Sequence, residues 1–386
     1  MAHSSSPVII SKLPQVGTTI FTVMSRLAAE HGAINLSQGF PDFDCSPDLL
    51  RHVSKAMNDG HNQYAPMQGL LSLRETLCAK MNRAYNVNYH PETDITITAG
   101  GTQAIYSAIS AFIREGDEVI LFAPAYDCYQ PAIELNGGVA VWSTLKQTDF
   151  SIDWPEVKKL INHRTRMIII NTPHNPSGTL LKKEDLEQLE KITKGTDILV
   201  LSDEVYEHLV FDGQEHNSVC KFPGLKERSI LIFSFGKTFH VTGWKMGYAL
   251  APANLMAEFR KAHQFIVFAV NTPMQHGLNA YLQNEENYNS LSAFYQQKRD
   301  FFLDGIKGSR FSFRPSGGTY FQLLDYSAIA DEKDTDFSIR LTKEKKLASI
   351  PISVFYHEPV NTKVLRFCFA KKEETLKRAI DVINSI

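Results

Sequence analysis

The sequence predicts an α/β fold with a mainly parallel sheet, followed by a smaller α+β unit. Between Thr93 and Pro252, short β-rich runs alternate with stretches of helical spacing, as in strands joined by crossover helices. Most of these runs are apolar throughout, which is expected of strands covered on both faces. After about residue 284 the pattern changes to a long helical stretch and several short strand-like segments. These observations predict a large domain and a second, smaller one.

The large sheet is predicted to have seven strands. They are residues 94–99, 117–122, 139–144, 166–171, 198–203, 229–235 and 246–251. Helices are predicted at 103–116 and 182–195, because both stretches have helical spacing and end in glycine, a common stop signal.

The rest of the chain is predicted to form the second unit. A long helix is expected at 287–308, and it is followed by the strand-rich stretches 311–325, 348–355 and 363–370. The first 45 residues are rich in loop signals and are too irregular to form a domain alone. We therefore expect a segment at 1–45 that joins the small domain, a large domain at 46–283 and a small C-terminal domain at 284–386.

The bulk composition excludes several classes of function. A net charge of −2 without a basic stripe argues against binding to nucleic acid or anionic lipid. No apolar run approaches the roughly 18 residues of a membrane helix, and the N-terminus lacks the pattern of a secretory signal. The five cysteines are scattered without a C-x-x-C pair, which indicates a reducing compartment and argues against a structural zinc site. We expect a cytoplasmic protein.

The stretch SFGKTFHVTGWKMG (234–247) places a lysine directly after an apolar strand. Gly236-Lys237-Thr238 matches the end of the nucleotide-binding phosphate loop G-x-x-x-x-G-K-[ST]. The first glycine of that motif would fall at position 231, which is leucine. The sequence therefore excludes this phosphate loop and leaves Lys237 to be explained.

Polar residues follow four of the predicted strands, at the carboxyl ends where α/β sheets gather their functional residues. They are Asn171; Asp203 with Tyr206; Ser234 with Lys237 and Lys245; and the run Gly100-Gly101-Thr102-Gln103 at a helix start. Taken singly, each has an ordinary explanation, because a strand-end aspartate is a common helix cap and the sequence NPSG is common turn chemistry.

Taken together, these residues describe one site. A glycine-rich helix N-terminus binds phosphate through free N–H groups and the helix dipole, and Ser234 and Lys245 would add a hydroxyl and a cation. The carboxylate of Asp203 would hold a ring nitrogen protonated, and Lys237 would form a Schiff base. These are the parts of a pyridoxal-phosphate site.

Eight stretches, in order and with matching spacing, resemble the fold-type I aminotransferases of class I/II, and among them the kynurenine/glutamine/methionine aminotransferase group. They are INLSQGFPDF (34–43), YAPMQGLLSLRE (64–75), GGTQAI (100–105), APAYDCY (123–129), NTPHNPSGT (171–179), SDEVYEHL (202–209), FSFGKTFHVTGWKMG (233–247) and VLRFCFA (364–370). The resemblance implies the fold of type I pyridoxal-phosphate-dependent transferases. It also implies a ping-pong transfer of an amino group to a 2-oxo acid.

The resemblance also implies roles for individual residues. Lys237 would bond to the aldehyde of pyridoxal 5'-phosphate and, once freed by the substrate, carry a proton between the substrate Cα and the cofactor. Asp203 would keep the pyridine nitrogen cationic, which stabilises the negative charge that develops in the reaction. Asn175 and Tyr206 would hydrogen-bond the phenolate oxygen and lower the pKa of the Schiff base. Tyr126 would stack on the ring.

The same resemblance implies how the phosphate is held. The implied contacts are Gly101, Thr102, Gln103, Ser234 and Lys245, with Tyr64 reaching the phosphate from the other subunit of a homodimer. Many members of the superfamily have arginine where this chain has Lys245, and lysine supplies the charge without the planar fork. The kynurenine/methionine group shares the sequence GWK, so we interpret this lysine as a feature of the subfamily.

The substrate contacts are also implied by the resemblance. Arg366 would clamp the α-carboxylate with its planar guanidinium, Asn175 would contact the substrate, and Gly39 would lie close to the same carboxylate. Aminotransferases specific for dicarboxylates use a further arginine. The stretch HQFIVFAVNTPMQ (263–275), which is expected to face the partner's site, contains none.

An apolar, aromatic-rich pocket is predicted for the substrate side chain. The residues proposed for it are Phe40, Phe265, Phe268, Val270 and Tyr356. We therefore predict methionine and aromatic amino acids as donors, with glutamine and histidine as further candidates, and a poor reaction with aspartate.

Other functions are compatible with the same motifs. A pyridoxal-phosphate-dependent C–S β-lyase, a synthase of the aminocyclopropane type, or a kynurenine or glutamine transaminase would carry the same scaffold. A non-enzymatic transcription regulator with an aminotransferase-like domain is disfavoured, because residues 1–33 are too few for a DNA-binding domain before the first motif. A binding module without activity would be expected to have lost Lys237 or Asp203, and both are present.

Overall fold

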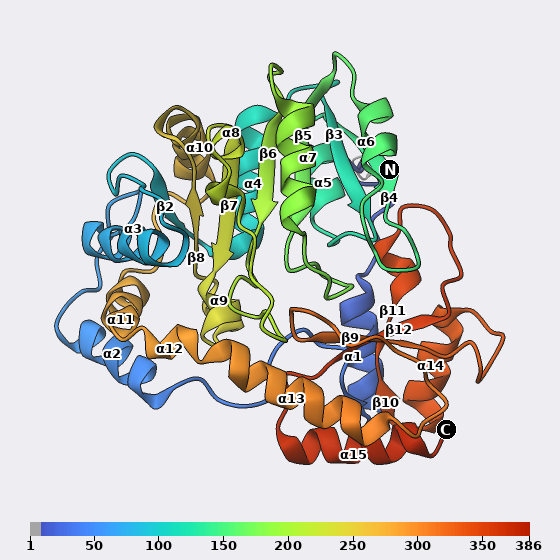
Figure 1. Cartoon of the computed structure of the whole chain (residues 1–386). Coiled ribbons are helices and arrows are strands. Elements are labelled where there is room, and N and C mark those ends of the chain that lie inside the picture. The colour runs from blue at the N-terminus through green and yellow to red at the C-terminus, as the bar shows by residue number, and fades with distance from the viewer. Residues whose placement is uncertain (1–8) are drawn as a thin grey trace, which may run out of the picture.

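A seven-stranded sheet forms the centre of the large domain in the computed structural model, which describes residues 9–386 (Figure 1). Its strands are β2 (Ile95–Thr98), β3 (Glu118–Ala123), β4 (Val139–Thr144), β5 (Thr165–Asn171), β6 (Leu199–Asp203), β7 (Ser229–Ser234) and β8 (Gly247–Leu250). Their order is β2-β8-β7-β6-β5-β3-β4, and only β8 runs antiparallel to its neighbours. The predicted mainly parallel sheet is confirmed, and each strand lies within one residue of its predicted bounds.

The strands are continuous apolar runs because both faces of the sheet are covered. On β5, Met167 and Ile169 belong to the apolar cluster under α4 (Gly100–Phe112) and α10 (Ala253–Ile266). Ile168 and Ile170, which point to the opposite face, belong to a second cluster under α3 (Leu71–Tyr85), α6 (Trp154–Leu160) and α7 (Lys183–Thr193). Through this alternation, both faces of the sheet pack against a layer of helices.

The two helices predicted within the large domain are present. The end of α7 agrees with the glycine signal, because Gly195 directly follows the C-cap residue and has a left-handed φ of +75°. By contrast, α4 begins three residues earlier than predicted and ends at Phe112, so Gly116 lies in the turn that leads to β3. The large domain also contains α2 (Pro47–Asn58), α5 (Tyr129–Leu135), α8 (Pro223–Lys226), α9 (Phe235–Thr238) and α11 (Thr272–Leu282).

The C-terminal part begins with two helices rather than the single one predicted. A short α12 (Glu286–Asn289) is followed after Ser290 by the long α13 (Leu291–Ile306), which packs against α15 (Glu373–Asn384) (Figure 1). A three-stranded antiparallel sheet follows, in the order β11 (Ile350–Pro351), β12 (Val364–Cys368) and β9 (Phe321–Asp325). Helix α14 (Asp334–Glu344) completes this part.

The N-terminal segment contains a helix that the sequence analysis missed. Helix α1 (Ile20–Glu30) is capped at its N-terminus by Thr19, whose hydroxyl accepts a hydrogen bond from the N–H of Thr22. It buries Met24 and Ala28, one turn apart on the same face, so it is stabilised by packing rather than by local signals. Directly after it, β1 (Ile34–Asn35) pairs in parallel with β10 (Leu347–Ala348). This pairing joins the N-terminal segment to the C-terminal part of the chain.

Among residues 9–386, no helix combines the length and the apolar composition that a membrane crossing requires. The expectation that the N-terminus carries no secretory signal rests partly on residues 1–8, which lie outside the described residues.

Candidate active site

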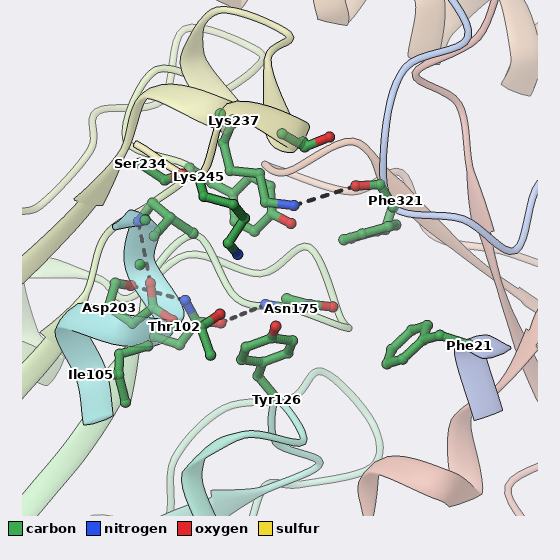
Figure 2. A pocket seen from close by; sticks show the side chains of 18 of the residues that line it. Phe21, Thr102, Ile105, Tyr126, Asn175, Asp203, Ser234, Lys237, Lys245 and Phe321 are labelled. Atoms are coloured by element: carbon green, nitrogen blue, oxygen red, sulfur yellow. Dashed lines mark hydrogen bonds between the residues drawn. The ribbon is translucent and has the colours of Figure 1, made fainter. Parts of the chain in front are cut away.

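A cavity of about 250 Å³ lies where β5, β6 and β7 end (Figure 2). The carboxyl ends of parallel strands meet at one edge of the sheet, so residues far apart in sequence converge there. Figure 2 shows Asp203 at the end of β6, Asn175 in the loop after β5 and Lys237 in α9 around the same space. The predicted site residues that line the cavity are Gly39, Gly101, Thr102, Tyr126, Asn175, Asp203, Tyr206, Ser234, Lys237, Lys245 and Arg366.

One end of the cavity has the features of an anion site. The first turn of α4 supplies Gly101 and Thr102, and Ser234 and Lys245 line the same region. The backbone approaches closely here, because a Cβ on Gly101 would lie 3.2 Å from a methyl group of Val205. A helix N-terminus, a hydroxyl and an ammonium group in one place suit a phosphate.

Asp203 is a buried carboxylate with uncharged partners. It is 3% exposed, its Oδ2 accepts a hydrogen bond of 2.6 Å from the Tyr129 hydroxyl, and its Oδ1 accepts one of 3.4 Å from the Val205 N–H. Burial raises the pKa of the carboxyl group from 3.8 to about 6, although both hydrogen bonds oppose this shift. A cationic group brought next to this carboxylate would remove the penalty of its burial.

Lys237 also lies among uncharged partners. Its Nζ donates a hydrogen bond of 2.9 Å to the Tyr320 hydroxyl and one of 3.3 Å to the Gly39 carbonyl oxygen. Burial lowers the pKa of the amine from 10.5 to about 8. A lysine with such a pKa is partly neutral near neutral pH and can act as a nucleophile or a base.

Arg366 is almost fully buried at the opposite side of the cavity. Its Nη1 donates a hydrogen bond of 2.7 Å to Asn175 Oδ1, and its guanidinium lies 3.8 Å from the centre of the Phe321 ring. Burial lowers its pKa to about 10. Within the described part of the chain, its Nε has no hydrogen-bond partner although it is buried. An orphaned donor on a buried cation is the arrangement that a carboxylate ligand completes.

Seven predicted site residues do not line the cavity: they are Gln103, Tyr64 and the five residues proposed for the side-chain pocket, Phe40, Phe265, Phe268, Val270 and Tyr356. The side chain of Gln103 bonds to the Ala99 N–H, and its amide nitrogen lies within hydrogen-bond distance of both Ser107 and His263. Phe40 is partly exposed and its carbonyl oxygen accepts a hydrogen bond from Lys371. Tyr64 is 82% exposed on the surface, where its ring meets Phe268 edge to face.

Several residues at the site were not predicted as site residues, and four of them are aromatic. Tyr129 contacts Asp203, Tyr320 contacts Lys237, and Phe21 and Phe321 line the cavity. Tyr129 lies in the motif APAYDCY, whereas Phe321 lies outside the eight motifs, and nothing in the sequence shows which aromatic side chain faces the cavity. Phe21 belongs to helix α1, which was not predicted, so no sequence signal could have placed it.

Residues 31–383 match the model of the family described as aminotransferase class I and II. The chain belongs to this family. The match covers both the large sheet and the C-terminal part, and it confirms the predicted family, the fold-type I architecture and the assignment of an aminotransferase.

Curated relatives and solved structures agree with the family assignment. This aminotransferase is 49% identical to the methionine aminotransferase of Escherichia coli K12, over 97% of this chain and 98% of that protein. It is 33% identical to human kynurenine–oxoglutarate transaminase 3, over 97% of this chain and 89% of that protein. Its structure superposes on that of YbdL from Escherichia coli, reported with a methionine aminotransferase function. The TM-score is 0.96 at 47% identity, over 99% of this chain and 100% of that chain.

Proposed function

We propose that this aminotransferase moves the α-amino group of methionine and of aromatic amino acids to a 2-oxo acid, with pyridoxal 5'-phosphate as its cofactor. The observation that carries the proposal is the arrangement of three buried groups around one cavity. Within residues 9–386, the Asp203 carboxylate makes no ion pair, the Lys237 amine has a lowered pKa, and the Nε of Arg366 has no hydrogen-bond partner.

The residues of the cavity fit this cofactor at each of its polar groups. Gly101, Thr102, Ser234 and Lys245 would hold the phosphate, and Asp203 would face the ring nitrogen. Tyr126 would lie against the ring.

Asn175 and Tyr206 would hold the ring oxygen. Because Asn175 Oδ1 already accepts a hydrogen bond from Arg366, its amide N–H groups remain available to donate to that oxygen. Tyr206 is buried in the same wall, and burial raises the pKa of its hydroxyl, so it stays protonated and also donates.

When bound, the cofactor supplies an aldehyde that takes up the amino group and a cationic ring that withdraws electrons from the substrate Cα. The protein supplies the positioning and the proton transfers. Arg366 would bind the donor's α-carboxylate through its free N–H groups, which fixes the direction of the Cα–H bond. The amine of Lys237 would then take the proton from the donor's Cα and deliver it to the cofactor, because its lowered pKa lets it exist in both forms near neutral pH.

The proposed donors follow from the walls of the cavity and from the relatives. Phe21, Ile105 and Phe321 provide apolar surface, and Arg366 is the only arginine among the lining residues that the structure describes. A second arginine would be needed to pair a side-chain carboxylate, so aspartate and glutamate should be poor donors. The relative at 49% identity is named for methionine, which is an apolar donor of suitable size.

Kynurenine transamination is the second candidate, because one relative with 33% identity over nearly the whole chain is named for it. Kynurenine carries an aromatic ring and no side-chain carboxylate, so the same pocket would accept it. A C–S β-lyase activity would use the same residues, and it is distinguished by its products, ammonia and pyruvate in place of a 2-oxo acid of the donor.

We also propose that the enzyme is a homodimer in which Tyr64 reaches the phosphate of the partner subunit. Tyr64, Phe265 and Phe268 are exposed aromatic residues, the rings of Tyr64 and Phe268 meet edge to face, and Tyr64 does not line the cavity of its own chain. Such a cluster is expected to be covered by a partner. The predicted pocket roles of Phe40, Val270 and Tyr356 remain part of this proposal, as does the predicted phosphate contact of Gln103. Light scattering after size-exclusion chromatography tests the proposed homodimer, and an active monomer would contradict the homodimer.

Two broader expectations also stay proposals. The five cysteines are free thiols in the structure, which supports a reducing compartment and hence the cytoplasm. The pairing of β1 with β10 supports the predicted division, in which residues 1–45 join the small domain.

The decisive experiment is to add L-methionine to the purified, cofactor-bound enzyme without any oxo acid. The visible band of the bound cofactor should give way to that of its aminated form, with one equivalent of the 2-oxo acid of methionine released. The same measurement with L-aspartate should be slower. Faster conversion of aspartate would overturn the proposed pocket, and ammonia release would assign the enzyme to the lyases.

A further inference from the structure

We propose that Tyr320 is a positioning residue for Lys237: its hydroxyl, fixed by the Gly39 carbonyl, holds the lysine amine in one orientation whenever the amine is not covalently bound. This inference rests on the proposed function, because it assigns a task to Tyr320 in the proton transfer by Lys237. The residue lies in the stretch SGGTYF just before β9, outside the motifs that suggested the site.

The hydrogen bonds around Tyr320 show which group donates and which group accepts. Its hydroxyl donates to the Gly39 carbonyl oxygen at 2.5 Å, so the phenolic proton is committed. The lone pairs of the same oxygen face the Lys237 amine, which lies 2.9 Å away and donates to it. The amine also donates to the Gly39 carbonyl oxygen at 3.3 Å. These three groups form a closed triangle in which the Tyr320 hydroxyl donates to the Gly39 carbonyl oxygen and the amine donates to both of these oxygens.

The ring that carries this hydroxyl cannot easily move. Tyr320 is completely buried, and its ring packs edge to face against Tyr206 and Phe321 and at a tilt against Tyr295. The acceptor Gly39 lies against the Phe321 ring, because a Cβ at that position would be 2.9 Å from it. Two fixed oxygens therefore define the position of a flexible lysine amine.

Burial also raises the pKa of the Tyr320 hydroxyl well above its usual value, so the hydroxyl stays neutral over the working range. A neutral oxygen that accepts from the amine favours the protonated form of Lys237 only modestly. It therefore orients the amine without locking the proton on it, as a carboxylate would. This combination suits a group that must both take and return a proton.

A matched control is available in the same cluster. Tyr295 is as buried as Tyr320 and packs against it, but within residues 9–386 its hydroxyl has no hydrogen-bond partner. Tyr295→Phe therefore removes a buried hydroxyl from the same aromatic cluster without touching the amine. Tyr320→Phe removes the hydroxyl that contacts it.

The first measurement is the pKa of Lys237 in the full-length chain freed of cofactor. It is obtained from the rate at which fluorodinitrobenzene labels this lysine, read by mass spectrometry over a series of pH values. The other titratable groups that face the amine are Asp203, Tyr206, Lys245, Arg366 and Cys368, and neither substitution changes them. Tyr320→Phe should lower the pKa of the amine by about one unit, because an oxygen that favours the charged donor is lost. Tyr295→Phe should leave it unchanged.

The second measurement uses the cofactor-bound enzyme and L-methionine deuterated at Cα. In Tyr320→Phe the rate of the half-reaction should fall about 10- to 100-fold, with KM little changed. The deuterium isotope effect should rise, because proton transfer becomes the slow step. Tyr295→Phe should keep the rate and the isotope effect of the unchanged enzyme.

An unchanged pKa of Lys237 in Tyr320→Phe, or an unchanged isotope effect, would overturn the proposal. If Tyr320→Phe does not fold, Tyr320→3-fluorotyrosine keeps the shape of the side chain and weakens its oxygen as an acceptor. This replacement should lower the pKa of Lys237 by less than Tyr320→Phe does. Failure of the unchanged enzyme to react with methionine would refute the proposed function instead, and the labelling of Lys237 would still report on Tyr320.

Discussion

Two of the enclosed lysines of this protein, Lys80 and Lys237, differ in the charge of their partners. Lys80 in α3 is 3% exposed and donates a hydrogen bond of 2.6 Å to the carboxylate of Glu207 and one of 3.2 Å to the Tyr248 hydroxyl. Lys237 donates to a tyrosine hydroxyl and a backbone carbonyl, both uncharged. Lys80, which is paired with a carboxylate, stabilises the fold. Lys237, whose hydrogen-bond partners carry no charge, has its pKa lowered to about 8 and becomes reactive.

The acids of the stretch SDEVYEHL show the same contrast. Burial by itself would raise the pKa of Glu207, but Lys80 and His208 hold it well below its usual value. Asp203, four residues earlier, is equally enclosed but forms no ion pair within residues 9–386; the charge of Lys237 offsets only part of the effect of burial, and the pKa of Asp203 rises to about 6. Buried groups that lack an opposite charge are therefore the ones that face the cavity, where a ligand can supply it.

The largest effect is expected from replacing the unpaired lysine. Lys237→Arg keeps a positive charge but can neither form a Schiff base nor give up its proton. It should slow the half-reaction with L-methionine by at least about 10⁴-fold. Stopped-flow spectroscopy of the cofactor band measures the rate, and thermal unfolding checks that the fold is retained. A rate within tenfold of that of the unchanged enzyme would show that Lys237 is not the reactive lysine.

Replacing the paired lysine should act on stability instead. Lys80→Met leaves Glu207 as a buried charge without a partner and should lower the free energy of unfolding by about 3–5 kcal/mol, measured in urea. The penalty should shrink as the pH falls and Glu207 takes up a proton.

The double variant Lys80→Met/Glu207→Gln is the matched control and should recover most of the loss, because no buried charge remains. If the single variant is as stable as the unchanged protein, the ion pair does not hold α3 to the SDEVYEHL stretch.

Asp203→Asn should stabilise the cofactor-free chain. The folded pKa of Asp203, about 6, lies above its unfolded value of 3.8, so the folded chain binds more protons between these values and loses stability as the pH rises through them. Above about pH 7 the variant should be more stable by about 3 kcal/mol, and the difference should vanish in acid. Urea unfolding at several pH values measures it. A variant of lower stability at neutral pH would show that Asp203 has a counter-charge in the free chain.

The smallest effect is expected from Lys237→Met in the cofactor-free chain. The folded pKa of Lys237, about 8, lies below its unfolded value of 10.5, so the unchanged chain gains stability as the pH rises between the two. Below this window the variant should be more stable by about 1 kcal/mol, an effect limited by solvent screening at a partly exposed site. Calorimetry at two pH values checks this. A marked loss of stability would mean that Lys237, like Lys80, holds the fold together.

The sequence by itself determined the sheet and most of the site. Continuous apolar runs predicted the strands to within one residue, because a strand covered on both faces needs apolar side chains at every position. Strand ends then located Asn171, Asp203 and Ser234, since parallel strands bring their carboxyl ends to one edge.

Only the tertiary structure decided which side chains act as partners. Glu207 lies 127 residues after Lys80, and Tyr320 lies 83 residues after Lys237, so no local pattern connects either pair. Helix α1, which contributes Phe21 to the cavity, is likewise stabilised by packing against distant segments. The charge state of a buried group depends on what surrounds it in space. For this reason a lysine that holds the fold and a lysine that reacts cannot be told apart until the chain has folded around them.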